Sequence, residues 1–185
     1  VIIRARTNKE EAMNKMATTG ARMLSVEEAS RYAGGFDDPA RLVSAFAGVA
    51  PSVSSNGISI HGNAPHLLQW RLEDVEIPNP NHFADIATLG GGILSSLSSQ
   101  VLGNSDFFTG AFPAEYGNAV SGVFDMKLRN GNNQKNENTI QVGIMGIDVA
   151  SEGPFSKKHK ASYIFNYRYT TTGIQNLDGG TKHYQ

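Results

Sequence analysis

Three histidines, His61, His66 and His82, are the residues of this chain that come nearest to a metal-binding set. They could form a site if their loops converged, but their spacing matches no zinc pattern. The chain has no cysteine, so it offers no thiolate ligand and no disulfide. We therefore interpret the histidines as ordinary polar or loop residues, and we predict no metal site and no cofactor.

The side chains that could support catalysis also lack a suitable context. Glu73, Asp74 and Glu76 could supply an acid–base pair, but a solvated turn explains them better, because a catalytic carboxylate needs an enclosing pocket. The serines between positions 95 and 99 lack the Gly-x-Ser-x-Gly elbow of a hydrolase. The glycines at 90–92 lack the lysine of a phosphate-binding loop. The sequence thus indicates that the protein is not an enzyme.

The composition describes a domain with a modest core and a mostly neutral surface. Hydrophobic residues make up 39% of the 185 residues and charged residues 18%, and there are 20 glycines. Sixteen basic residues against 17 acidic ones give a net charge of -1, which disfavours a nucleic-acid partner. The sequence begins at Val1 without a signal peptide, and we expect it to be an internal part of a longer protein.

The elements that must position these residues begin after a polar arm. Residues 1–24 read as a linker. The capping pattern at Ser25 predicts a helix over residues 25–32, and Asp38-Pro39 predicts a second helix over residues 39–47. Alternating apolar residues then predict short strands, two of which pair about a tight turn at Glu73-Asp74. These strands are residues 58–60, 67–72, 75–77, 106–109 and 120–128.

A stretch without apolar residues, 130–138, marks a domain boundary. Beyond it, apolar residues alternate with polar ones, most clearly at Tyr163, Phe165, Tyr167 and Tyr169. Strands with one aromatic face and one mostly polar face suit a membrane β-barrel. A soluble hairpin with one buried face is an alternative of comparable weight on the pattern alone.

Four segments, in this order and spacing, resemble the plug domain of TonB-dependent outer-membrane receptors, most closely those of the Bacteroidetes type. Residues 38–49 resemble the opening helix and its Gly-Val, and Ile58-Ser59-Ile60-His61-Gly62 resembles the family's I-x-I-R-G strand. Residues 68–77 resemble the next strand pair, and residues 110–123 the closing G-P-x-x-x-x-Y-G-x-x-x-x-G-V segment. Each motif alone is weak, but four in register rarely arise by chance.

The resemblance implies a small α+β plug with a mixed sheet of four or five strands over residues 25–130. The first strands of a transmembrane β-barrel would follow over residues 139–185, with turns at 143–146 and at Gly153-Pro154. It also implies an outer-membrane location and, as partners, the protein's own barrel, TonB through a segment near or before Val1, and an extracellular nutrient. A surface lipoprotein is a further partner that the family leaves open.

By the same resemblance, two loops, 62–66 and 78–83, face the substrate. Their neutral amides and aromatics favour a glycan or a peptide over a ferric siderophore. Two family arginines that join plug to barrel are replaced here by His61 and Thr109, and His61 stays the candidate for a plug–barrel contact. The substrate-facing residues are Asn63, His66, Asn79, Asn81, His82 and Phe83.

The main rival is a soluble carbohydrate-binding module of a secreted protein. Trp70 is the only tryptophan of the chain and could stack on a sugar. A lone tryptophan in a strand of a small domain is more often part of the core. The sequence predicts a core role for Trp70 and leaves the module as the alternative function.

Overall fold

The computed structural model describes residues 11–25, 31, 39–51, 57–82, 84, 95–143, 146–156 and 161–170. Its contacts divide the chain into two compact units, Val1–Arg129 and Asn130–Gln185. The division falls at the start of the polar stretch 130–138. None of the described helices is long and apolar enough to cross a membrane.

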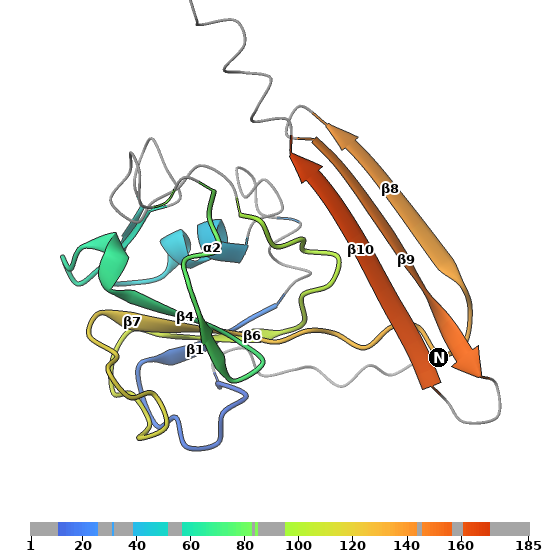
Figure 1. The fold of residues 1–185 in the computed structure, drawn as a ribbon. Helices are drawn as coiled ribbons and strands as arrows, with labels where there is room; N and C mark the ends of the chain where they lie inside the picture. Colours follow the sequence, from blue (N-terminus) through green and yellow to red (C-terminus); the bar gives the residue numbers. More distant parts are fainter. Residues whose placement is uncertain are drawn as a thin grey trace, which may run out of the picture. The chain divides into compact units, whose positions relative to one another are not determined.

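A five-stranded mixed sheet organises the first unit (Figure 1), and this confirms the predicted mixed sheet. The strand order is β1-β6-β7-β4-β5. β4 runs parallel to β7, and every other neighbouring pair is antiparallel. The strands are β1 (Ala21–Leu24), β4 (Leu68–Leu72), β5 (Val75–Ile77), β6 (Ser105–Phe108) and β7 (Gly122–Met126).

The edge strand β1 corrects the prediction that residues 1–24 are a linker. Ala21–Leu24 pairs with β6 in four-residue register, from Ala21 opposite Phe108 to Leu24 opposite Ser105. Met23 and Leu24 are buried in the unit. The sequence did not predict this strand, because it is only four residues long and has no β-branched residue.

The helical part is shorter than predicted. α2 (Pro39–Leu42) continues as a turn of 3-10 helix, η1 (Val43–Ala45), so the helix expected over 39–47 ends two residues early. The helix expected over 25–32 lies almost entirely outside the described residues. β2 (Val49–Pro51) and β3 (Ile58–Ile60) then pair in a separate two-stranded sheet. The unit is therefore mostly β with few helices.

The main core lies between this helical segment and one face of the five-stranded sheet. Phe107 and Phe124 meet edge to face there, with ring centroids 5.7 Å apart, and Trp70 packs on Phe124 at 5.3 Å. Side chains on alternate strand positions reach this face because successive residues of a strand point to opposite sides. The other buried members include Leu24, Val43, Ile60, Leu68, Leu102 and Met126.

The opposite face of the sheet carries a smaller apolar cluster and a buried polar group. Phe108, Tyr116 and Val123 form the apolar part, and the rings of Phe108 and Tyr116 lie 4.8 Å apart. Asp106 and Asp125 are buried beside them. This face is covered in part by residues 13–14, whose backbone N–H groups donate to Asp106.

The β4–β5 hairpin forms where the sequence predicted it. Glu73 and Asp74 both adopt positive φ, 50° and 67°, which is the backbone of a two-residue type I′ turn. Glycine and asparagine usually occupy such positions, so these two residues need compensation. Glu73 Oε1 accepts the Leu128 N–H, and Lys127 forms an ion pair with Asp74.

The second unit is a three-stranded antiparallel meander of order β10-β9-β8. β8 (Glu137–Gly143) and β9 (Gly146–Ser156) reverse between Gly143 and Gly146, as predicted. The predicted turn at Gly153-Pro154 is wrong, because both residues lie inside β9 and pair with β10 (Ala161–Thr170). The irregular register at Ala161/Ser162 accommodates Pro154, which has no N–H for the ladder.

Candidate functional site

The two predicted substrate-facing loops flank the same end of the β4–β5 hairpin, opposite its turn. The first loop leads through η2 (Pro65–Leu67) into β4, and the second leaves β5 after Ile77. β5 pairs only with residues 70–72 of β4, so the sheet edge beside Leu68 and Gln69 has no β5 partner. Pro78 cannot donate a ladder hydrogen bond, which explains why pairing stops there.

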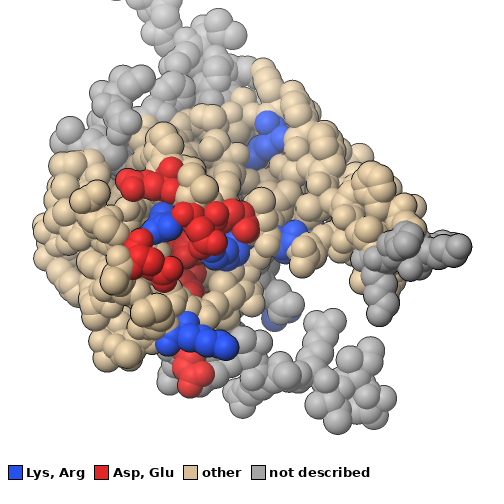
Figure 2. All heavy atoms as spheres, turned by 60° about the horizontal axis from the view of Figure 1, so that its bottom comes forward, with Lys and Arg blue, Asp and Glu red and all other residues tan. Residues whose placement is uncertain are grey.

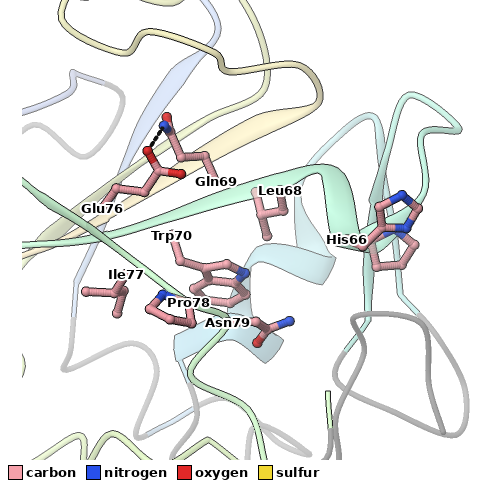
Figure 3. A pocket seen from close by; sticks show the side chains of 9 residues that line it. His66, Leu68, Gln69, Trp70, Glu76, Ile77, Pro78 and Asn79 are labelled. Atoms are coloured by element: carbon pink, nitrogen blue, oxygen red, sulfur yellow. Dashed lines mark hydrogen bonds between the residues drawn. The ribbon is translucent and has the colours of Figure 1, made fainter. Parts of the chain in front are cut away.

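A cavity of about 250 Å³ occupies this open edge, and we refer to it as the notch. Figure 3 shows His66 on one side of it and Trp70, Pro78 and Asn79 on the other. Strand residues and loop residues thus share its wall. The lining is Pro65, His66, Leu68, Gln69, Trp70, Glu76, Ile77, Pro78 and Asn79.

Of the predicted substrate-facing residues, the structure brings two to the notch, His66 and Asn79. Asn63 lies outside the lining and uses its side-chain Nδ2 to donate to the Ile60 carbonyl at 3.0 Å. Asn81 is buried, and its backbone bridges to Ser95. Neither Asn81 nor His82 lines the notch, and Phe83 lies outside the described residues.

Two strand residues that the sequence did not assign to the substrate side, Gln69 and Glu76, complete the polar wall. Gln69 Nε2 donates to Glu76 Oε2 at 3.0 Å and to the Gly117 carbonyl at 3.1 Å. These two bonds fix the amide, and its Oε1 is buried without a hydrogen-bond partner among the described residues. Gln69 is only 9% exposed, so leaving this acceptor without a donor costs free energy.

Trp70 has the predicted core position and also reaches the notch. Its side chain is 5% exposed and packs on Phe124, so most of the indole belongs to the main core. Its Nε1 has no hydrogen-bond partner in the described part of the chain. Figure 3 shows this nitrogen on the ring edge that faces the space between Leu68, His66 and Asn79. Buried indole N–H groups normally have a partner.

His61, the candidate for a plug–barrel contact, lies in the turn after β3 with φ 50° and is exposed. Its backbone N–H donates to the Gly48 carbonyl at 2.9 Å. A Cβ at Gly48 would come within 2.6 Å of His61 Nε2, so the imidazole lies directly against that glycine. The contact of His61 with a barrel stays a prediction.

The charge on the notch wall is acidic. Glu76 is the only carboxylate of the lining, and the lining contains no lysine or arginine. Arg71 lies directly opposite Glu76 in the β4–β5 register but outside the lining, and the other polar side chains of the wall are the amides of Gln69 and Asn79 and the imidazole of His66. Among the residues that the structure describes, no group of three or more His, Asp or Glu side chains is placed to hold a metal ion.

A second polar cluster lies on the face of the sheet that carries Asp106 and Asp125. Figure 2 shows acidic side chains gathered around a few basic ones on one face of the molecule. Here Lys127 Nζ lies 3.7 Å from Asp125 Oδ1 and also pairs with Asp74, while the guanidinium of Arg71 lies over the Tyr116 ring. These charges have partners within the unit, so we assign the cluster a structural role.

No family model matches the sequence, and no curated protein matches it. Among solved structures, a variant of the ferric enterobactin receptor PfeA from Pseudomonas aeruginosa, in complex with enterobactin, is similar at a TM-score of 0.49. The identity is 15%, over 77% of this chain and 24% of that one. The outer membrane transporter YddB from Escherichia coli is similar at a TM-score of 0.47 and 14% identity, over 72% of this chain and 26% of that one.

The chain thus spans about a quarter of the length of the solved structures it matches. A second structure of the ferric enterobactin receptor, in complex with BCV-L6, gives a TM-score of 0.48 at 15% identity. All three TM-scores lie below 0.5. The function of this chain therefore has to rest on its own residues.

Proposed function

We propose that the chain is the plug of a TonB-dependent outer-membrane receptor together with the first strands of its barrel. In this role the first unit occludes the barrel and helps to bind and admit a nutrient such as a glycan or a peptide. The single observation that carries the proposal is the exposed apolar face of β8–β10. It follows directly on a mixed-sheet unit whose sequence carries the four plug motifs.

The strand registers place the large apolar side chains of the described meander residues on one face, with Ile164 as the exception. Ile140 lies opposite Val149, which lies opposite Tyr167, and Val142, Ile147 and Tyr169 form the next row. Val142 is 77% exposed, an unusual state for a large apolar residue in water. The other exposed members are Ile140, Ile147, Phe155, Phe165, Tyr167 and Tyr169.

The reverse face of the same strands is mostly polar and carries one large apolar residue, Ile164. Gln141, Asp148 and Arg168 lie opposite one another in the register, and Asn166 donates to the Asp148 carboxylate. β9 and β10 have 11 and 10 residues, which is the length that a tilted strand needs to cross the hydrocarbon core. Alternation of this kind supports a lipid-facing side and a lumen-facing side.

The first unit has the surface that a plug needs, because a plug lies against the polar wall of a wide barrel. Its second face carries paired charges beside a small apolar cluster, and its main apolar core lies on the other face of the sheet. The Bacteroidetes type, the outer-membrane location, the TonB contact near or before Val1 and a cooperating surface lipoprotein belong to the same proposal. So does the absence of catalysis.

The second candidate function is the soluble carbohydrate-binding module, and the notch is the observation that favours it. A small cavity with a tryptophan, two amides and a carboxylate is a suitable place for a sugar on a soluble protein. A soluble module does not explain the exposed apolar face of β8–β10. A plug with its barrel accounts for both the notch and this apolar face.

Neighbouring residues of β8 allow a direct test in the intact protein. Ile140 is on the apolar face and Gln141 on the polar face, and both are exposed. Insertion into phospholipid vesicles should be destabilised by about 2–4 kcal/mol in Ile140→Lys, because a lysine then faces lipid. The matched variant Gln141→Lys should insert like the wild type. Equal behaviour of the two variants, or a wild-type protein that stays monodisperse in buffer without lipid or detergent, would contradict the proposal.

A further inference from the structure

The polar stretch that follows the first unit is folded, although its composition is that of a flexible linker. Asn132 Oδ1 accepts the N–H groups of Gln134 and Lys135 at 2.9 and 3.2 Å. An asparagine side chain that binds the backbone a few residues on closes an Asx turn, which fixes the local path of the chain. We refer to residues 131–136, which contain this turn, as the clasp.

Both ends of the clasp lie against strands of the meander. At its start, Gly131 lies against the backbone of β10, because a Cβ at this position would overlap the Tyr163 carbonyl oxygen. At its end, the Asn136 side chain lies over Gly153 of β9, where a Cβ would overlap Asn136 Oδ1. Glycine permits both close approaches because it has no Cβ. The clasp is thus packed onto the second unit.

The clasp also binds an acidic pair at the start of the β8–β9 ladder. Glu137 of β8 lies directly opposite Glu152 of β9, and like charges in this position destabilise a sheet. Asn132 gives each carboxylate one donor, its N–H to Glu152 Oε2 at 2.7 Å and its Nδ2 to Glu137 Oε2 at 2.9 Å. Lys135 forms an ion pair with Glu137 and, together with Asn132, lowers the pKa of that carboxyl below 4.5, whereas Glu152 raises it. One asparagine therefore joins both strands at the pair that repels.

On the other side of the boundary, the chain is bound to the first unit as far as Arg129. The Arg129 N–H donates to the Val101 carbonyl at 3.0 Å, and its Nε donates to the Gln100 carbonyl at 2.6 Å. One residue, Asn130, lies between Arg129 and the clasp. Asn130 is exposed and has no hydrogen bond to another described residue. The free part of the connection is therefore a single residue.

We propose that the clasp confines movement between the two units to Asn130 and keeps β8 paired with β9 when the first unit moves. A pull that arrives through Arg129 reaches the clasp before it reaches β8. Because Asn132 is bonded to both members of the first pair, this pull loads β8 and β9 together and does not peel one strand from the other. The inference goes beyond the proposed function and applies equally to a soluble module. In a receptor, the clasp lets the plug move while the start of the barrel stays closed.

Two neighbouring asparagines provide a matched test by hydrogen exchange in the intact protein. Asn132→Ala removes the acceptor of the Asx turn and the side-chain donor to Glu137. The N–H groups of Gln134 and Lys135, and the protected ones at the start of β8, should then exchange about tenfold faster or more. Asn133→Ala should leave all of them unchanged, because Asn133 is exposed and makes none of these bonds. Equal exchange in the two variants would overturn the proposal.

Removal of one of the two facing charges separates the pairing of β8 from the turn itself. In the double variant Asn132→Ala, Glu137→Gln, one carboxylate is lost and an amide donor stands beside Glu152. The start of β8 should recover most of its protection, while the N–H groups of Gln134 and Lys135 should keep their fast exchange. A β8 that exchanges alike in the wild type, the single variant and the double variant would show that the clasp does not hold the strand.

The movement itself can be measured between two spin labels, since the chain has no cysteine of its own. Val120→Cys and Gln141→Cys place one label on an exposed position of each unit. If Asn132→Ala opens the clasp, its six residues join the single free residue of the connection. The reach of a flexible chain grows with the square root of its length, so the distance distribution should become about two- to threefold wider. Asn133→Ala should leave the width unchanged.

Equal widths in the parent, Asn132→Ala and Asn133→Ala would overturn the confinement of movement to Asn130. The vesicle experiment with Ile140→Lys and Gln141→Lys does not depend on the clasp. Failure of the clasp therefore leaves the proposed receptor standing, and failure of lipid insertion leaves the clasp standing.

Discussion

Asp106 on β6 lies directly opposite Asp125 on β7, and both carboxylates are buried. Like charges at opposed positions destabilise a sheet unless other groups satisfy them. Asp106 receives the backbone N–H groups of Met13 and Asn14, each at 2.8 Å. Asp125 receives the Tyr116 hydroxyl at 2.9 Å and has Lys127 Nζ at 3.7 Å. The segment before β1 is thus held to the sheet by the Asp106 carboxylate, together with the Asn14 side chain, which donates to Glu115 and to the Tyr116 hydroxyl.

Asp106→Asn should loosen this segment. The amide has one acceptor oxygen in place of two, so one of the two backbone N–H groups loses its partner. We expect hydrogen exchange at Met13 or Asn14 to become about tenfold faster, as the loss of a charge-assisted bond implies. Asp74→Asn, on the exposed turn, is the control and should leave this exchange unchanged. Full protection of both amides in Asp106→Asn would show that the carboxylate does not hold the segment.

The same carboxylate should give stability a specific pH dependence. Burial raises the pKa of Asp106 above 3.8, against the lowering effect of the Met13 and Asn14 N–H groups. Asp125 raises this pKa further and Lys127 lowers it. The folded protein therefore keeps the proton at pH values where the unfolded chain has released it. The resulting stabilisation is complete below the unfolded pKa and is lost as pH rises through the folded pKa.

Urea unfolding of the wild type and Asp106→Asn over a series of pH values checks this sign. The free energy of unfolding of the wild type, relative to that of the variant, should fall as the pH rises from about 3.8. Groups that titrate alike in both proteins, such as Asp74, cancel in this difference. Parallel pH profiles would mean that Asp106 titrates alike in the folded and unfolded states.

Tyr116→Phe should destabilise the first unit by about 1–3 kcal/mol, the cost of a buried charged acceptor that loses its donor. The Tyr116 hydroxyl donates to Asp125 Oδ2 and accepts from Asn14 Nδ2 at 3.1 Å. Asp125 Oδ1 already lacks a hydrogen-bond donor among the described residues, so no neighbouring donor there replaces the lost Tyr116 hydroxyl. Tyr167→Phe removes an exposed hydroxyl from β10 and should leave chemical unfolding nearly unchanged. Equal midpoints for both variants would contradict the expectation.

Gly122→Ala should cost about 1–3 kcal/mol through overpacking. A Cβ at position 122 would lie 2.2 Å from Ile60 Cδ1 and 2.8 Å from the Phe108 carbonyl oxygen. Position 117 is the matched control, because a Cβ there meets nothing within 4 Å. Differential scanning calorimetry should show a lower Tm for Gly122→Ala and a nearly unchanged Tm for Gly117→Ala. A Gly122→Ala protein as stable as the wild type would show that Ile60 moves aside freely.

The local features of the fold could be predicted from the sequence, and the distant contacts could not. The β4–β5 hairpin follows from alternation on both sides of Glu73-Asp74, which is information within ten residues. The bonds from residues 13 and 14 to Asp106 join positions that are 93 and 92 residues apart. The pattern of apolar residues does not predict such bonds, because it carries no information on the partner of a backbone N–H. β1 was missed for the same reason, since its partner strand decides its conformation.

The notch shows the same division. His66 and Asn79 were singled out because they lie in the loops that the resemblance to plugs assigns to the substrate side, and the structure places both in the notch lining. Gln69 was not singled out, and Glu76 was interpreted as part of a solvated turn, because alternation within a strand predicts only exposure or burial. The stop of β5 at Ile77 opens the sheet beside Gln69, and only the register of the pair reveals that stop.

The edge position of β1 has a mechanical consequence. Any tension that enters the unit through the chain before Glu11 reaches first the bonds that Met13 and Asn14 make to Asp106, Glu115 and Tyr116, and then the single ladder between β1 and β6. The inner strands, β7 and β4, are each held by neighbours on both sides and carry no part of that load at the start. The unit should therefore yield stepwise from its rim inward, with its aromatic centre the last part to separate.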